Sequence, residues 1–203
     1  SGLVFPSNQV MVIGGANSSG YLSSCETFTG STGAWTSAPS MATARALPAV
    51  ARYDTGKFLA AGGMNSSLPA LSTVEGFHWS ATPAWSALPS MGARRAGHTA
   101  TSLFTTSPWS NQGQSHVLVA GGYDHLGALV SVARRYEPSS NTWVNAGSMA
   151  TAVYAHTATQ VLAGTYQYDV FVGGGHNGSQ AVNVLQRYNR TTATWTTSAG
   201  SVF

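Results

Sequence analysis

Short apolar runs alternate with clusters of Gly, Asn, Ser and Pro along the whole chain. The longest runs, such as 117–120 and 170–172, are the length of a strand and end at glycines. Runs of this kind, punctuated by turn-forming residues, predict short β-strands. No segment shows a sustained period of 3.6 residues, so no long helix is predicted. The hydrophobic pattern therefore predicts an all-β protein.

A diglycine follows an apolar strand four times, and an Asn or Asp stands two residues after each pair. The pairs and the residues that follow them are Gly14-Gly15 with Asn17, Gly62-Gly63 with Asn65, Gly121-Gly122 with Asp124, and Gly174-Gly175 with Asn177. Glycine permits a positive φ or a close approach by a neighbouring backbone. The recurrence shows that the chain is built from internal repeats.

Aromatic residues recur in the same register. Each diglycine is followed by a tryptophan, and another aromatic residue precedes each tryptophan by seven or eight positions: Phe28 and Trp35, Phe77 and Trp85, Tyr136 and Trp143, Tyr188 and Trp195. A methionine stands six residues after each of the first three tryptophans, at Met41, Met91 and Met149. Large flat side chains bury much area, so we expect these residues to fill the space between adjacent sheets.

The period of about fifty residues, the diglycine and the aromatic pair resemble the kelch repeat. The segments 91–101 and 149–159 are similar to tandem kelch repeats of bacterial and extracellular proteins. The resemblance implies an all-β, kelch-type β-propeller with four repeats of four antiparallel strands, A to D. The repeats are approximately 1–47, 48–97, 98–155 and 156–203, within a single domain of residues 1–203.

The strands of one repeat are assigned from the same pattern. Strand A is predicted at 98–104, strand B as the run into the diglycine, strand C at 129–136 and strand D around the tryptophan, with a turn at 138–141. Propellers have about 4–8 blades, and unpaired strand edges are liabilities that need a cover. Three arrangements stay open: part of a larger ring, a pair of copies, or a closed four-bladed ring.

The composition is poor in charge. Asp, Glu, Lys and Arg make up 7% of the chain, whereas about 25% is usual in globular domains. The apolar share of 43% is normal, so the chain is expected to fold. The net charge of +3 comes from scattered basic residues with no run interleaved with aromatics, which argues against nucleic acid as a partner. No apolar run is long enough to span a membrane.

Antiparallel strands place the D–A and B–C loops on one face of the propeller. The residues expected there as candidate binding residues are Asn17, Arg45, Asn65, Arg95, Asp124, His125, His176 and Asn177. Amide, imidazole and guanidinium groups bind acidic groups or sugar hydroxyls. The structural alternative is that Asn and Asp recur because they tolerate the turn geometry.

Two further features invite a chemical interpretation. His98 and His156 occupy equivalent repeat positions, where they either hold a metal or serve the repeat itself; recurrence favours the structural role, and no metal is expected. Cys25 is the single cysteine, and it is interpreted as a small buried apolar residue. Galactose-oxidase-like copper enzymes also use kelch propellers, with a Tyr–Cys cofactor, but no matching Tyr and His constellation surrounds Cys25 and Tyr21. We therefore expect no enzymatic activity and no cofactor.

Irregular loops on a regular scaffold often carry specificity. The third repeat has an insertion at about 105–115 with Trp109 in its middle, and the fourth has a shorter one around 164–168. An exposed tryptophan there suits contact with a protein or a sugar. A neutral insertion is the alternative.

Four Asn-x-Ser/Thr sequons begin at Asn17, Asn65, Asn177 and Asn189, and all are candidate glycosylation sites. Together with the low charge they favour an extracellular, secreted setting. The sequence thus predicts a non-enzymatic interaction or structural module that binds a protein partner, or further blades or copies, through face loops and blade edges. A carbohydrate-binding module and a galactose-oxidase-like oxidase are the alternatives.

Overall fold

The computed structural model describes residues 2–5, 9–104 and 115–197, which form four antiparallel sheets of four strands each. The first sheet contains β1 (Gly2–Phe5), β2 (Gln9–Asn17), β3 (Gly20–Thr29) and β4 (Ala34–Ala38). The second contains β5 (Ala49–Asp54), β6 (Lys57–Ala61), β7 (Val74–His78) and β8 (Ala84–Leu88). The third contains β9 (Thr99–Leu103), β10 (His116–Ala120), β11 (Val132–Glu137) and β12 (Thr142–Ser148). The fourth contains β13 (Thr157–Gln160), β14 (Val170–Gly173), β15 (Leu185–Asn189) and β16 (Thr194–Thr197).

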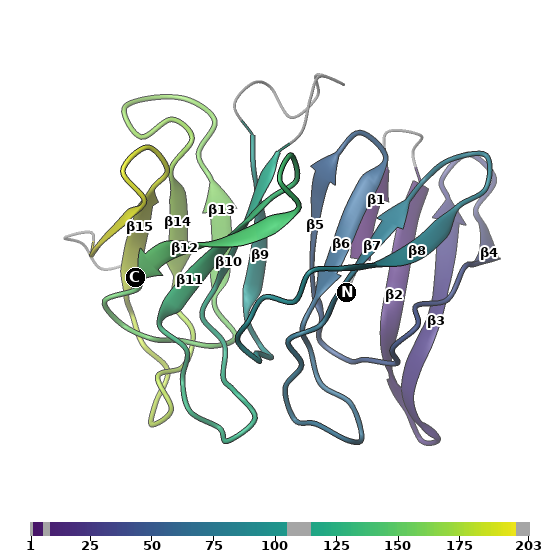
Figure 1. The fold of residues 1–203 in the computed structure, drawn as a ribbon, viewed down its shortest axis with the longest axis horizontal. Helices are drawn as coiled ribbons and strands as arrows, with labels where there is room; N and C mark the ends of the chain where they lie inside the picture. Colours follow the sequence, from purple (N-terminus) through teal and green to yellow (C-terminus); the bar gives the residue numbers. More distant parts are fainter. Residues whose placement is uncertain (1, 6–8, 105–114, 198–203) are drawn as a thin grey trace.

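Each sheet is one blade, because its strands pair in chain order and correspond to the predicted strands A to D. The predicted all-β fold with four repeats of four antiparallel strands is therefore confirmed. The A strands of neighbouring blades, from β1 through β5 and β9 to β13, contact one another in sequence. The blades follow one another along the longest axis, with the first and fourth at opposite ends (Figure 1).

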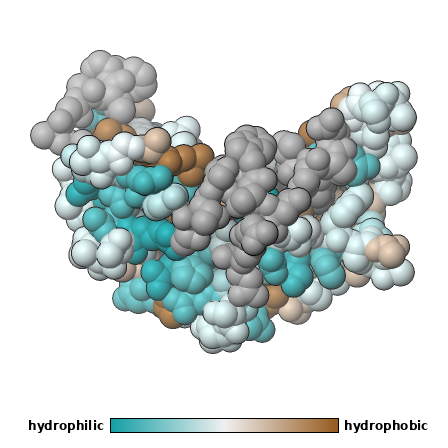
Figure 2. All heavy atoms as spheres, turned by 90° about the horizontal axis from the view of Figure 1, so that it is seen from above, coloured by the Kyte–Doolittle hydropathy of each residue, from teal (hydrophilic) through white to brown (hydrophobic). Residues whose placement is uncertain are grey.

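Viewed from above, the molecule has a bowed outline (Figure 2). Much of the surface in this view is pale, of intermediate hydropathy, which fits a surface rich in Ser, Thr and Gly and poor in charge (Figure 2). In the described part of the chain the A strands of blades that are neighbours in chain order contact one another, so each blade interface can be compared with the next.

The recurring aromatic residue and tryptophan of each blade are directly opposed across strands C and D. In the third blade Tyr136 pairs with Trp143, and the ring centroids lie 5.3 Å apart. The other three blades repeat this pairing: Phe28 with Trp35, Phe77 with Trp85, and Tyr188 with Trp195. Aromatic cross-strand pairs stabilise a sheet, so this pair fixes the C–D register in every blade.

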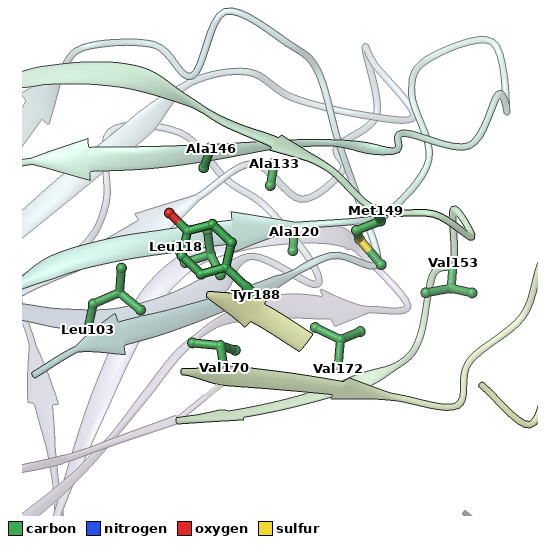
Figure 3. Close-up of a cluster of buried hydrophobic side chains, with 10 residues drawn as sticks. All are labelled: Leu103, Leu118, Ala120, Ala133, Ala146, Met149, Val153, Val170, Val172 and Tyr188. Carbon is green, nitrogen blue, oxygen red and sulfur yellow. The ribbon is translucent and has the colours of Figure 1, made fainter. Parts of the chain in front are cut away.

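Three hydrophobic cores lie between adjacent blades. The core between the third and fourth blades joins Leu118 and Ala120 of β10 to Val170 and Val172 of β14 (Figure 3). Met41, Met91 and Met149 each lie in one core, at the start of the linker to the next blade. The unbranched thioether fills the irregular space where linker and sheets meet. This explains why methionine recurs in the sequence.

Cys25 lies in the core between the first and second blades. It is 2% exposed, and burial raises the pKa of its thiol. The interpretation of Cys25 as a small buried apolar residue is therefore confirmed.

Candidate functional site

The D–A linkers and the B–C loops lie together on one face, as predicted, and we call this the linker–loop face. Isolated bridges join each linker to the B–C loop of the following blade: Ala46 with Met64, Ala96 with Tyr123, and Tyr154 with His176. This face is at the bottom of Figure 1, whereas the A–B and C–D connections are at the top. The linker–loop face is thus formed by loops from neighbouring blades that hold one another in place.

The diglycines make this close approach possible. Gly62 has a φ of 59°, and a Cβ added to it would lie 2.5 Å from the carbonyl oxygen of Arg95 in the next linker. Gly63 donates its N–H to the same oxygen at 3.0 Å. Gly15 and Gly122 make the same hydrogen bond. Gly15 donates to the carbonyl oxygen of Arg45 and Gly122 to that of Val153, each in the linker that follows its blade. A side chain at the first glycine would push the linker away, so the diglycine is required by packing between blades.

The Asn or Asp after each diglycine shapes its own loop. Asn17, Asn65, Asp124 and Asn177 each accept backbone N–H groups two to four residues ahead through the side-chain oxygen Oδ1, at 2.8 to 3.1 Å. This is the local turn that short polar side chains favour. The structural alternative for these four positions is therefore supported by the geometry.

Arg45 and Arg95 were expected at the surface of this face, and that placement is corrected. Both side chains are fully buried. Arg45 donates to the carbonyl oxygens of Gly62 and Thr73 at 2.9 and 3.0 Å and pairs with Glu75 at 2.7 Å. The two arginines recur because each tethers a linker to the next blade.

Arg95 lacks the carboxylate partner that Arg45 has. It donates to the carbonyl oxygens of Gly121 and Val132 at 3.1 to 3.3 Å. Burial, together with the nearby positive charge of Arg134, lowers the pKa of Arg95 to about 10. Arg134 occupies the repeat position of Glu75, which explains the loss of the partner.

His98 and His156 lie buried against the first glycine of the preceding blade. A Cβ at Gly62 would be 2.7 Å from Cε1 of His98, and His156 packs in the same way on Gly121. Burial lowers the pKa of both imidazoles, that of His156 to about 4, so both rings are neutral near pH 7. The packing supports the structural role favoured by their recurrence.

An open pocket of about 650 Å³ lies on the linker–loop face between the second and third blades. Its polar lining comes from Arg94 on the linker and from Asp124, His125 and Ser131 on the B–C loop of the third blade. The guanidinium of Arg134 lies beside Gly92 at its edge. Oδ1 of Asp124 is already occupied by two loop N–H groups. The pocket thus presents cationic donors beside a loop of fixed shape.

Arg94 was missed by the sequence reasoning. It stands next to Arg95, but it is half-exposed and lines the pocket, whereas Arg95 is buried. Arg95 was chosen because it recurs at the position of Arg45. In a repeat protein recurrence marks packing, so the neighbour that does not recur was the better candidate for a surface role.

Aromatic rings lie in a row on the same face, further along. Tyr123 contacts Tyr154 edge to face at 5.5 Å, and Tyr154 contacts His176 at 5.2 Å. Nδ1 of His176 accepts the N–H of Gly178 at 3.0 Å. The candidates His125 and His176 therefore belong to two different groups, the pocket and this aromatic row.

The remaining candidates have different positions. Trp109 lies outside the described residues. Asn17 is exposed, and Asn65, Asn177 and Asn189 are half-buried. Asn189 caps the C–D turn of the fourth blade, where Oδ1 accepts the N–H of Thr191 at 2.9 Å. All four asparagines of the sequons thus lie at turns, with Asn17 and Asn189 as the last residues of β2 and β15.

Neither a metal centre nor a membrane-spanning helix emerges from the described part of the chain. Within residues 2–5, 9–104 and 115–197, no three His, Cys, Asp or Glu side chains are grouped so that they could hold a metal ion. In the same residues no helix is long and apolar enough to cross a membrane.

Comparison with known proteins gives one family. The Kelch motif matches residues 112–150 and 158–200, which correspond to most of the third and fourth blades. A comparison with curated proteins found no match. The matched residues include the diglycine and the tryptophan of each of the two blades.

Proposed function

We propose that this kelch-repeat chain is a non-enzymatic module that binds a protein partner through the linker–loop face. Kelch repeats are generally protein-interaction scaffolds. The observation that carries the proposal is the pocket between the second and third blades. Two accessible side chains that do not recur in the repeats, Arg94 and His125, both line this pocket.

The chemistry of this pocket favours an acidic group on the partner. Arg94 and Arg134 contribute positive charge, and the buried guanidinium of Arg95 lies close to Arg134. One carboxylate oxygen of Asp124 already accepts two loop N–H groups. A guanidinium binds a carboxylate with good geometry and charge. We therefore propose that the partner inserts an Asp or Glu side chain between Arg94 and the loop of the third blade.

Site-specific photo-crosslinking tests this function. A photoreactive residue at Leu126, the 79% exposed tip of the pocket loop, is compared with one at Ser139 in a C–D turn on the opposite face. Both are incubated with proteins from the native source of the chain. A protein that is captured from position 126 and not from 139 supports the proposal. Equal capture from both positions, or capture only from 139, contradicts it.

Carbohydrate binding is the second candidate, and the aromatic row favours it. Tyr123, Tyr154 and His176 offer ring surfaces that are half-exposed on the linker–loop face. Aromatic side chains combine an apolar face with a polar end, which suits contact with sugars. A glycan array probed with the native chain and with Tyr154→Ala tests this candidate. Binding that the variant loses would favour it over the protein partner, and an empty array would remove it.

We further propose that the protein is secreted and glycosylated. The support is the low charge and the position of Asn17, Asn65, Asn177 and Asn189 in turns that reach the surface. The intact mass of the native protein tests this. Excess mass that is lost on treatment with an N-glycosidase agrees with the proposal, and a mass equal to the 21.0 kDa of the bare chain opposes it.

A further inference from the structure

The first blade leaves open a face that packs against the preceding blade in every other blade. We call this the leading face; it consists of Val10, Val12, Glu26, Phe28 and Trp35, on strands β2, β3 and β4. Trp35 is 55% exposed and Val12 is 39% exposed. The residues at the position of Val12 in the next three blades, Ala60, Val119 and Val172, have no exposed surface.

The three internal interfaces show what covers this face. Trp85, Trp143 and Trp195 each donate the indole N–H to a backbone carbonyl of the preceding blade, on Pro39, Pro89 and Ala146, at 2.8 to 2.9 Å. An indole N–H is a donor that is usually paired when it is buried. Trp35 is the equivalent donor, and its indole is exposed. By analogy with Trp85, Trp143 and Trp195, the acceptor that Trp35 lacks among the described residues is a carbonyl at the end of a strand D.

A second polar position gives the same result. Glu75 accepts the N–H groups of Ala42 and Thr43 from the preceding linker, at 2.7 and 3.0 Å. Gln186 accepts the N–H of Thr151 in the same way at 2.9 Å. Glu26 holds this position in the first blade, and it is exposed. The leading face thus has an apolar centre, a donor in Trp35 and an acceptor in Glu26. In the other blades the equivalent side chains bind backbone groups of the preceding blade and its linker.

Gly15, the second glycine of the first blade's diglycine, also indicates an open leading face. A Cβ at Gly63 or Gly175 would lie 2.5 or 2.7 Å from a carbonyl of the preceding linker. A Cβ at Gly15 would meet no described atom within 4 Å. The space that a preceding linker fills in the other blades is therefore open at Gly15.

The complementary surface is on the fourth blade of the same molecule. Phe171 and Leu185 stand at the repeat positions of Leu59 and Val74, which are buried against the following blade. Both are only half-buried in the fourth blade. The first and fourth blades lie at opposite ends of the molecule (Figure 1), so within one copy the two surfaces belong to blades that are not neighbours. One molecule thus carries both halves of the interface that joins its own blades.

We propose that the leading face of the first blade is a docking surface for the fourth blade of a second copy of this chain. The contact is heterologous, because unlike surfaces meet, and it builds a ring when the rotation closes or a filament when it does not. Trp35 donates to a strand-end carbonyl of the second copy, and Glu26 accepts N–H groups from the backbone that follows. The acceptor and donors are backbone groups, so the fit depends on the blade geometry rather than on particular side chains.

Sedimentation velocity of the full chain from about 1 to about 100 μM tests the association. Concentration-dependent assembly is expected for the native chain. Trp35→Ala is expected to weaken the association at least about tenfold, since buried tryptophans dominate interfaces. Glu26→Lys is expected to weaken it as well, and Ser139→Ala, which changes an exposed residue in the C–D turn of the third blade, away from the leading face, serves as the control. A native chain that stays monomeric throughout this range, or a loss of assembly with Ser139→Ala alone, overturns the proposal.

A photo-crosslink identifies the surfaces that meet. A photoreactive residue at Ser37 lies beside Glu26, which it faces across strands β3 and β4. Equal amounts of ¹⁴N- and ¹⁵N-labelled chain are mixed, so adducts between copies carry both labels. Mixed-label adducts on strands β13 to β16 are expected. Adducts between two first blades, or adducts within one copy only, contradict the proposed docking.

Discussion

Two buried histidines make the stability of this molecule depend on pH. The pKa of His156 in the folded chain is about 4, and that of His98 is well below its ordinary value; burial is the main cause for both, and Arg95 adds to the effect at His98. In the unfolded chain both are near 6.5. The folded state therefore binds fewer protons, so the stabilisation is complete above pH 6.5 and is lost as the pH falls toward 4.

The expected loss from His156 is on the order of 3 kcal/mol between pH 6.5 and pH 4, since one pKa unit corresponds to about 1.4 kcal/mol. Urea unfolding at a series of pH values measures it. His156→Gln keeps a polar group beside the hydroxyl of Thr99, which lies 3.0 Å from Nε2, and does not titrate. The variant is expected to show a shallower acid decline. An identical decline in variant and native chain contradicts the assignment.

Ala193 lies in the C–D turn of the fourth blade, where the third blade has Asn141 at the same repeat position. Ala193 has a φ of 54°, and its equivalent Asn141 has a φ of 53°. Asn141 accepts the hydroxyl of Tyr136 at 2.8 Å, whereas the buried hydroxyl of Tyr188 has only the guanidinium of Arg135, a donor, beside it and no acceptor among the described residues. Ala193→Asn is therefore expected to stabilise the fold by about 1–2 kcal/mol, from relief of backbone strain and a new acceptor. Thermal unfolding measures it.

Ala193→Gly is the matched control for this substitution. It relieves the left-handed backbone but supplies no acceptor for Tyr188, so a smaller gain is expected. A glycine variant as stable as the asparagine variant would mean that the hydroxyl of Tyr188 does not need a partner.

At the scale of the element, different side chains attach the first and third linkers to the blade that follows. The first linker pairs Arg45 with Glu75, and the third has Val153 and Gln186 at the same positions. Arg45→Val is expected to cost roughly 3 kcal/mol, because it leaves the carboxylate of Glu75 buried without its counter-charge. Adding Glu75→Gln reproduces the third linker and is expected to restore at least half of the loss. Chemical denaturation of the singles and the double measures this coupling.

An additive double variant, with a loss equal to the sum of the singles, would contradict this coupling. It would mean that the linker tolerates neither change for reasons other than charge. The Arg45 guanidinium also donates to backbone carbonyls of Gly62 and Thr73, which the valine cannot replace. Full recovery is therefore not expected.

The strands and their order could be predicted from sequence because each repeat carries the same signals in register. The aromatic pair, the diglycine and the methionine each report a contact that occurs in every blade interface. The role of single surface residues could not be predicted in this way. Arg95 recurs and is buried, and Arg94 does not recur and lines the pocket. Recurrence in the repeat thus predicts which residues pack between blades. Whether a particular side chain is buried or exposed there depends on contacts with residues far away in the sequence.

The first blade shows how the absence of a neighbour changes an element. Its B–C hairpin runs from β2 into β3 through the diglycine, and Ala16 pairs with Tyr21. In the other blades the equivalent residue bridges a preceding linker, as Met64 does with Ala46, and Tyr123 and His176 also bridge residues of their own loops. Among the described residues the hairpin of the first blade has the pairing within its own loop but no bridge to a preceding linker, a difference that the sequence repeat alone does not reveal.

At the scale of the whole molecule, regular blades support one irregular surface. Arg94, His125 and Leu126 lie on or beside the pocket on the linker–loop face, and none of them belongs to the repeat. The charge-poor remainder of the surface offers few competing sites for an acidic partner. Long-range attraction to such a partner is expected to weaken with rising salt concentration.

The most direct measurement is the affinity for the crosslinked partner of two triple variants. One changes the pocket, with Arg94→Ala, His125→Ala and Leu126→Ser. The control changes exposed C–D turns on the opposite face, with Ser31→Ala, Ala81→Ser and Ser139→Ala. The pocket variant is expected to bind at least about tenfold more weakly, and the control is expected to bind as the native chain does. Unchanged affinity in the pocket variant, or a loss confined to the control, would contradict the assignment of the linker–loop face as the binding surface.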